Sequence, residues 1–73
     1  MRFLTMNSIY EVDEQNKRIR RLEGANDPTP NQGEDGVWRE YVSLDPCQGG
    51  YLIVWDEGGN KATLTSQVLE VIE

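Results

Sequence analysis

The sequence predicts an all-β fold, a small and strongly bent barrel of five or six strands with no substantial helix. Short runs of strand-forming residues recur along the chain, separated by Gly, Pro, Asn and Asp at intervals of about eight to twelve residues. No segment has the spacing of apolar residues that marks an amphipathic helix. The 73 residues suffice for one core and therefore for a single domain. A barrel is the economical arrangement because closure hides the sheet edges.

A β-hairpin is predicted near the start of the chain. Residues 8–13 and 18–22 are its two arms, and the polar residues 14–17 join them. Ile19 and Leu22 stand three positions apart, which indicates either a bulge in the second arm or a short helical turn. We favour the hairpin because Ile, Tyr and Val dominate the first arm. Residues 1–6 precede it, and we expect them to form a loose N-terminal extension.

A long loop is predicted over residues 23–36. This segment contains two prolines, three glycines and no apolar periodicity. A loop of this length in a compact domain is usually either functional or disordered. Because neither flank is long enough to fold alone, we interpret the segment as a loop between strands rather than a linker between domains.

The second half of the chain predicts strands at residues 37–44, 51–56, 61–64 and 68–72, with turns at 45–50, 57–60 and 65–67. Residues 51–55 are the one continuous apolar run of strand length, so they predict the central strand. Alternation places Tyr51, Ile53 and Trp55 on one face and Leu52 and Val54 on the other. A small barrel buries only one of these faces. The long loop, a second copy of the chain or a partner would then cover the other.

The composition excludes several kinds of chemistry. The chain has no histidine and one cysteine, Cys47. It therefore cannot form an intramolecular disulfide, a Ser-His-Asp triad or a Cys/His zinc site. Its acidic residues lack the spacing of an EF-hand calcium loop. We expect no enzymatic activity, no cofactor and no metal ion. We also expect a reducing cytoplasm as its setting, with no targeting segment and no membrane span.

The net charge of −6 is unevenly distributed. Residues 1–21 carry five basic and three acidic residues, a net of +2, whereas residues 22–73 carry two basic and ten acidic residues, a net of −8. This acidity disfavours nucleic acid as a partner and favours a basic or mixed protein surface. The alternative is that it only keeps the domain soluble. The acidic residues could also mimic nucleic acid if they lay in rows on one surface, namely Glu34, Asp35, Glu40, Asp45, Asp56 and Glu57.

Aromatic residues and prolines are the first group of binding candidates. Exposed Trp and Tyr are common interface anchors; together with the prolines of the long loop, the partner-binding candidates are Pro28, Pro30, Trp38, Tyr41, Tyr51 and Trp55. The alternative is that the long loop covers these aromatic rings.

A basic cluster is the second group, and it comprises Lys17, Arg18, Arg20 and Arg21. This cluster could contact phosphate or an acidic partner. It could equally balance the chain's own acidity and protect an edge strand. No aromatic residue interleaves with it in the sequence, which disfavours a stacking platform for single-stranded nucleic acid.

The order of elements resembles that of SH3-like small barrels. A long loop and paired strands are followed by residues 62–72 (Ala-Thr-Leu-Thr-Ser-Gln-Val-Leu-Glu-Val-Ile). In this last segment a short turn leads to a final strand, as in those barrels. The long loop would take the position of the RT loop. The aromatic-proline signature of peptide-binding SH3 domains is absent, so the resemblance implies a fold and no ligand.

The chain also resembles the short accessory proteins of actinobacterial phages, in residues 9–22 (Ile-Tyr-Glu-Val-Asp-Glu-Gln-Asn-Lys-Arg-Ile-Arg-Arg-Leu) and 32–41 (Gln-Gly-Glu-Asp-Gly-Val-Trp-Arg-Glu-Tyr). This resemblance implies a phage origin and an early role against host machinery. We therefore expect a non-enzymatic protein-binding module that acts on a host protein in the bacterial cytoplasm, as an inhibitor. The alternatives are an acidic nucleic-acid mimic and a small-molecule-binding barrel that forms a homo-oligomer.

Overall fold

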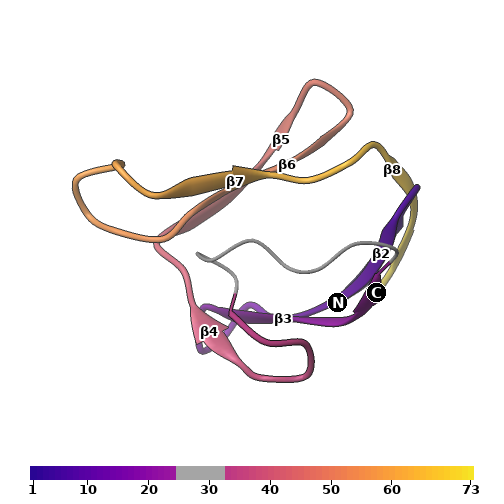
Figure 1. Cartoon of the computed structure of the whole chain (residues 1–73), viewed down its shortest axis with the longest axis horizontal. Helices are drawn as coiled ribbons and strands as arrows, with labels where there is room; N and C mark the ends of the chain where they lie inside the picture. Colours follow the sequence, from indigo (N-terminus) through magenta and orange to yellow (C-terminus); the bar gives the residue numbers. More distant parts are fainter. Residues whose placement is uncertain (25–32) are drawn as a thin grey trace.

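The computed structural model describes residues 1–24 and 33–73, and these residues form an all-β fold without a helix. This confirms the predicted all-β class, although the described residues form eight strands where five or six were predicted. The strands, coloured along the chain in Figure 1, are β1 (Arg2–Thr5), β2 (Ser8–Asp13), β3 (Arg18–Gly24), β4 (Arg39–Glu40), β5 (Ser43–Cys47), β6 (Gly50–Val54), β7 (Ala62–Leu64) and β8 (Val68–Ile72).

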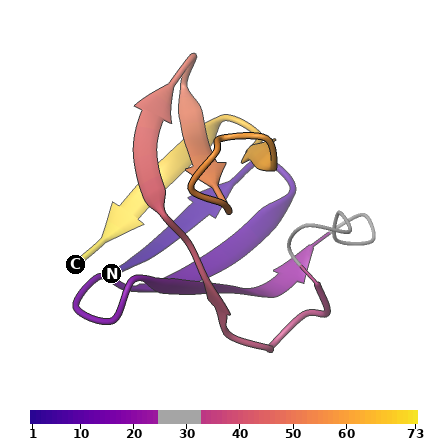
Figure 2. The same ribbon diagram turned by 90° about the vertical axis from the view of Figure 1, so that its left-hand side faces the viewer.

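The strands form two antiparallel sheets that face each other (Figures 1 and 2). One sheet has the order β4-β3-β2-β1-β8 and the other the order β5-β6-β7. The buried core lies between them: the five-stranded sheet contributes Phe3, Tyr10, Val12 and Ile19, and the three-stranded sheet contributes Ile53. In the described part of the chain the strands do not close into a barrel, so the expectation of one continuous barrel is not met.

Backbone hydrogen bonds connect the sheets on two sides. The Tyr41 amide donates to the carbonyl of Lys17 at 3.0 Å, and the next amide, that of Val42, donates to the carbonyl of Val54 at 2.7 Å. At the opposite side the Val68 amide donates to the carbonyl of Gly49 at 2.7 Å. These bonds satisfy backbone groups where the chain passes from one sheet to the other.

The predicted hairpin is confirmed as β2 and β3. Its register pairs Tyr10 with Arg21 but Ile9 with Glu23, so Leu22 is an extra residue on β3. This is the bulge that the three-residue spacing of Ile19 and Leu22 indicated. The extra residue lets the strand bury Ile19 and Arg21 on one face while Leu22 is only half-buried.

The expectation of a loose N-terminal extension over residues 1–6 is wrong. Residues 2–5 form β1, which lies between β2 and β8. Phe3 is fully buried, and its ring lies 4.8 Å from that of Tyr10 and 4.7 Å from that of Tyr51. A strand of four residues is too short to show an alternating pattern in the sequence. The burial of Phe3 against the rings of Tyr10 and Tyr51 stabilises β1 in the sheet.

The predicted strand over residues 37–44 is wrong as a single element. The structure has the short β4 and then β5, because the chain leaves one sheet and enters the other at Tyr41 and Val42. The predicted turn over residues 45–50 is shorter than expected. Pro46 lies within β5, which is an edge strand and so tolerates a residue without an amide hydrogen. The turn itself is Gln48-Gly49, with φ angles of 51° and 86° that suit a two-residue hairpin.

The predicted central strand is confirmed within its own sheet, since β6 lies between β5 and β7. Tyr51, Ile53 and Trp55 share a face, as predicted. Ile53 is fully buried and the two aromatic residues pack against the same core, so the structure shows that this is the inward face. Leu52 and Val54, on the other face, are half-buried. The predicted strands at 61–64 and 68–72 are confirmed as β7 and β8.

Candidate functional site

Three of the four predicted aromatic anchors line two open hollows that share residues, and we call these two hollows together the aromatic groove. It consists of two adjoining hollows of about 470 and 600 Å³ that share Lys17, Tyr41 and Val42. Tyr51 lines the first hollow, beside β5, and Trp55 lines the second, between the β2–β3 turn and the β6–β7 turn. The fold therefore brings Tyr41, Tyr51 and Trp55 to one surface feature, although they lie on different elements.

Each aromatic ring of the groove is anchored on its inner side. The Tyr51 ring packs against Phe3, and the indole nitrogen of Trp55 donates a hydrogen bond to Thr63 Oγ1 at 2.9 Å. Tyr41 packs on the edge of the core at the crossing between the two sheets. The three rings are half-buried. Since they are held before any partner arrives, little side-chain entropy would be lost on binding.

Burial and nearby acidic residues affect the titration of Tyr41. Burial raises the pKa of the Tyr41 phenol above its usual value of 10.0, and the carboxylates of Glu14 and Asp13 raise that pKa further. The phenol is therefore neutral at physiological pH and can donate a hydrogen bond.

Acidic residues outnumber basic ones around the groove. Five acidic residues line it, against a single lysine or arginine, Lys17. Asp56 accepts a hydrogen bond from the Lys61 amide at 3.0 Å and so stabilises the β6–β7 turn. The other four are exposed and form no ion pair with any residue of the described part, namely Glu14, Glu40, Asp45 and Glu57.

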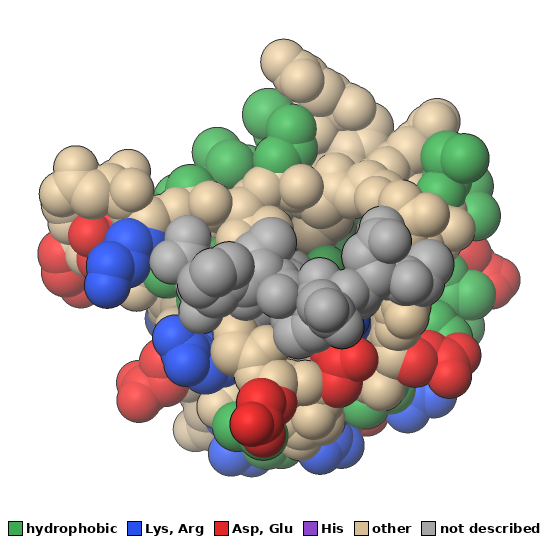
Figure 3. Space-filling model, viewed as in Figure 1, with side chains coloured by type: hydrophobic (Ala, Val, Ile, Leu, Met, Phe, Trp, Pro, Cys, Tyr) green, Lys and Arg blue, Asp and Glu red, His purple; other side chains and the backbone are tan. Residues whose placement is uncertain are grey.

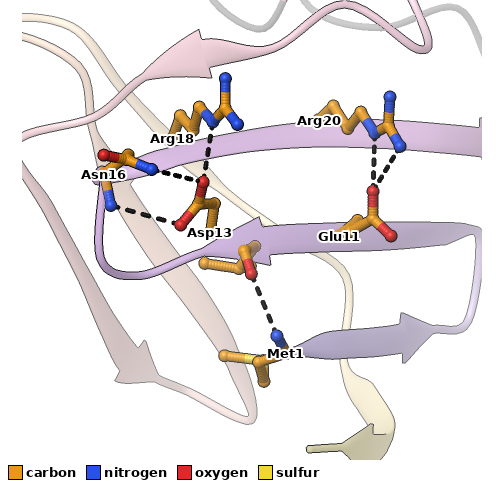
Figure 4. Close-up of polar contacts among 7 residues, drawn as sticks. Met1, Glu11, Asp13, Asn16, Arg18 and Arg20 are labelled. Carbon is orange, nitrogen blue, oxygen red and sulfur yellow. Dashed lines mark hydrogen bonds and ion pairs between the residues drawn. The ribbon is translucent and has the colours of Figure 1, made fainter.

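Arg18 and Arg20 of the basic cluster form ion pairs with acidic residues of the same chain (Figure 4). Arg18 Nε lies 2.9 Å from Asp13 Oδ2, and Arg20 Nε lies 2.8 Å from Glu11 Oε1. The hydrogen bonds of Arg20 and then of Arg2 lower the pKa of Glu11. Hydrogen bonds from Asn16 and then from Arg18 lower the pKa of Asp13.

Arg21 is almost fully buried, whereas Arg18 and Arg20 are half-buried. Its guanidinium binds both carboxylate oxygens of Asp35, at 2.6 and 3.2 Å, and lies 3.4 Å from Ser8 Oγ. Its carbonyl accepts a hydrogen bond from the Gly36 amide at 2.7 Å. Residues 33–36, the end of the predicted long loop, are therefore packed onto β3. The three arginines of the cluster are thus paired with acidic residues of the same chain.

Trp38 lies outside the aromatic groove. Its ring packs against two guanidinium groups, with centroid distances of 4.6 Å to Arg18 and 4.4 Å to Arg20. The pairing of Arg18 with Glu40 and of Ile19 with Arg39 brings the residues before β4 beside β3. No aromatic residue lies among these arginines in the sequence, but the fold brings Trp38 beside them from about twenty residues away. Pro28 and Pro30 lie outside the described residues.

Several groove residues are absent from the sequence-based candidates. Glu14 and Val42 have no distinguishing pattern, and Pro46 is easily interpreted as a turn residue. Lys17 was predicted with the arginines, but the structure places it in the groove instead. Lys17 has a φ of 51°, because the polar turn before β3 needs one residue in a left-handed conformation.

Exposed apolar side chains gather on β8, outside the aromatic groove. Leu69, Val71 and Ile72 are between 42% and 65% exposed. Hydrophobic side chains are visible on that side of the surface in Figure 3. β8 is an edge strand, whereas the opposite edge, β4, carries Arg39 and Glu40. Charged side chains protect an edge from pairing with another strand, so β8 is the less protected of the two.

Two kinds of site are absent from the part of the chain that the structure describes. No three His, Cys, Asp or Glu side chains gather there in a way that could hold a metal ion. No helix in residues 1–24 or 33–73 is long and apolar enough to cross a membrane. Comparisons with protein families, with curated proteins and with solved structures find no match to this chain.

Proposed function

We propose that the protein is a non-enzymatic binding module that docks onto another protein through the aromatic groove. The observation that carries this proposal is the convergence of Tyr41, Tyr51 and Trp55 on one open feature. Half-buried aromatic rings on a rigid core are the usual anchors of protein interfaces. The open shape of the groove suits a segment of polypeptide better than an enclosed small molecule.

A nucleic-acid mimic is the second candidate. Four of the six carboxylates that such a mimic needs line the groove: Glu40, Asp45, Asp56 and Glu57. Against it, Asp35 is bound by Arg21, and a mimic has no use for three aromatic rings among the carboxylates. We therefore rank protein binding first.

We extend the proposal to origin and fold. The sequence resemblance to actinobacterial phage accessory proteins supports a host protein as the partner and inhibition as the outcome. The pairing of the first strand, β1, with the last, β8, and the bonds between the sheets support an opened relative of the SH3-like barrel. This likeness concerns the fold alone and implies no ligand.

Affinity capture from actinobacterial cells tests the proposal. We expect the tagged chain to retain one stoichiometric protein, and we expect Tyr41→Ala to reduce its recovery at least tenfold. Lys17→Trp fills the groove without removing a core contact and should have the same effect. Leu69→Ser, on the exposed part of β8, is the matched control. Equal recovery by all four chains would contradict binding in the groove.

A further inference from the structure

The acidic residues of this chain fall into two groups with different surroundings. On the outer face of the five-stranded sheet, Glu11 is bound by Arg2 and Arg20, and Asp13 by Arg18. Around the aromatic groove the four exposed carboxylates have no such partner among the described residues. The arginines thus neutralise one surface, whereas the five acidic residues of the groove outnumber its single lysine, Lys17.

Each of the two hollows is lined by two of these exposed carboxylates. Glu14 and Asp45 line the first hollow, and Glu40 and Glu57 line the second. Tyr41 and Val42 lie where the hollows meet. A ligand that spans the two hollows therefore meets two exposed carboxylates in each, and between them the side chains of Tyr41 and Val42 beside the single lysine, Lys17. Phosphate is repelled by this pattern, whereas a cation at each end is attracted.

The same chain contains a model for how an arginine would bind there. Arg18 and Arg20 each stack on Trp38 while binding a carboxylate, Asp13 and Glu11 respectively. In the second hollow Trp55 lies with Glu40 and Glu57 and has no arginine in the described part. A guanidinium from outside would find the same combination of ring and carboxylate.

We infer that the occupant of the aromatic groove is an extended protein segment with lysine or arginine side chains on both sides of an apolar residue. The inference rests on the proposed function, because it names the chemistry of the partner at the same site. The apolar residue packs on Tyr41 and Val42. The basic side chains reach the carboxylates of the two hollows, with arginine favoured at the Trp55 end. A polyamine supplies the charges but lacks the central apolar contact.

Selection from a library of random nine-residue peptides tests the inference. The wild-type chain should enrich peptides with Lys or Arg on both sides of an apolar residue. For one such peptide, we expect Glu14→Gln and Glu57→Gln each to weaken binding about twofold to fivefold, as for exposed ion pairs. Glu70→Gln on β8 is the matched control and should leave binding unchanged. Raising the salt concentration should weaken binding by the wild-type chain.

Two results would overturn the inference. One is enrichment of peptides without flanking basic residues, or equal binding by the Gln variants and the control. The other is displacement of the peptide by spermine at the same concentration as by unlabelled peptide. If the Lys17→Trp chain still loses its captured protein in either case, the groove binds a partner of different chemistry. If no peptide is enriched and capture is unaffected by Lys17→Trp, the proposed function fails as well.

Discussion

The ring of Trp38 lies against the guanidinium of Arg20, with 4.4 Å between the ring centroid and the guanidinium carbon. Arg18 contacts the same ring at 4.6 Å. Directly after Trp38 the chain pairs with β3 through Arg39 and Glu40, and it then crosses to the second sheet at Tyr41. The contact therefore fixes the start of the segment that brings Tyr41 into the groove.

Loss of this contact should lower stability without removing any core side chain. We expect Trp38→Leu to reduce the free energy of unfolding by about 1 kcal/mol, the usual size of a cation–π pair near the surface. A double-mutant cycle with Arg20→Met, followed by urea unfolding, measures the pair directly. A coupling energy near zero would mean that the ring and the guanidinium are merely neighbours.

Asp35→Ala should lower the free energy of unfolding by more than the loss of an exposed ion pair would. Arg21 is only 8% exposed, so removing the carboxylate leaves a buried guanidinium with fewer acceptors. We expect a loss of about 1–3 kcal/mol in unfolding free energy. Thermal unfolding is the measurement, and a domain of this size should lose several degrees of melting temperature per kcal/mol. Glu34→Ala, on the adjacent exposed residue, serves as the control and should melt like wild type.

The first strand should be essential for folding. Phe3→Ala removes a fully buried ring that contacts two others, and we expect it to cost about 3–5 kcal/mol. That is a large part of the stability of a small domain. Met6→Ala, at a side chain that is 66% exposed, should change little. Circular dichroism with urea titration distinguishes them, and a fully stable Phe3→Ala chain would contradict the role given to β1.

Stability should fall on acidification. The pKa values of Glu11 and Asp13 are lowered from their ordinary 4.5 and 3.8 by the bonds that their carboxylates accept. Their contribution is therefore complete above pH 4.5 and is lost as the pH falls through the lowered values. Melting temperatures from pH 6 downward, at about one-unit steps, measure the loss. Glu11→Gln should show a shallower decline than wild type, and parallel curves would disprove the contribution of Glu11.

The sequence predicted local elements well and long-range placement poorly. The β2–β3 hairpin and the placing of Tyr51, Ile53 and Trp55 on one face of the chain follow from alternation within a few residues. The bulge at Leu22 was one of the two alternatives that the spacing indicated. β1 was missed because the burial of Phe3 depends on Tyr10 and Tyr51, which lie on other strands. Pro46 suggested a turn because an edge strand cannot be identified before the order of strands is known.

The candidate site shows the same division. Aromatic residues were recognised as candidate anchors by type alone, and Tyr41, Tyr51 and Trp55 do lie in one groove. Nothing in the sequence separates Trp38 from them, since its arginine contacts depend on the pairing of β3 with β4. The free carboxylates could not be predicted either. They are distinguished from Glu11 and Asp13 only by the positions of the arginines in the folded chain.

Site-specific photocrosslinking tests the central claim most directly. Val42 lies where the two hollows meet, and Leu69 is exposed on β8. A photoreactive phenylalanine analogue is placed at one position or the other, and the chain is irradiated in actinobacterial cells. If the aromatic groove is the docking site, the probe at position 42 crosslinks one protein and the probe at position 69 does not. Crosslinking of that protein from position 69 alone would contradict the account.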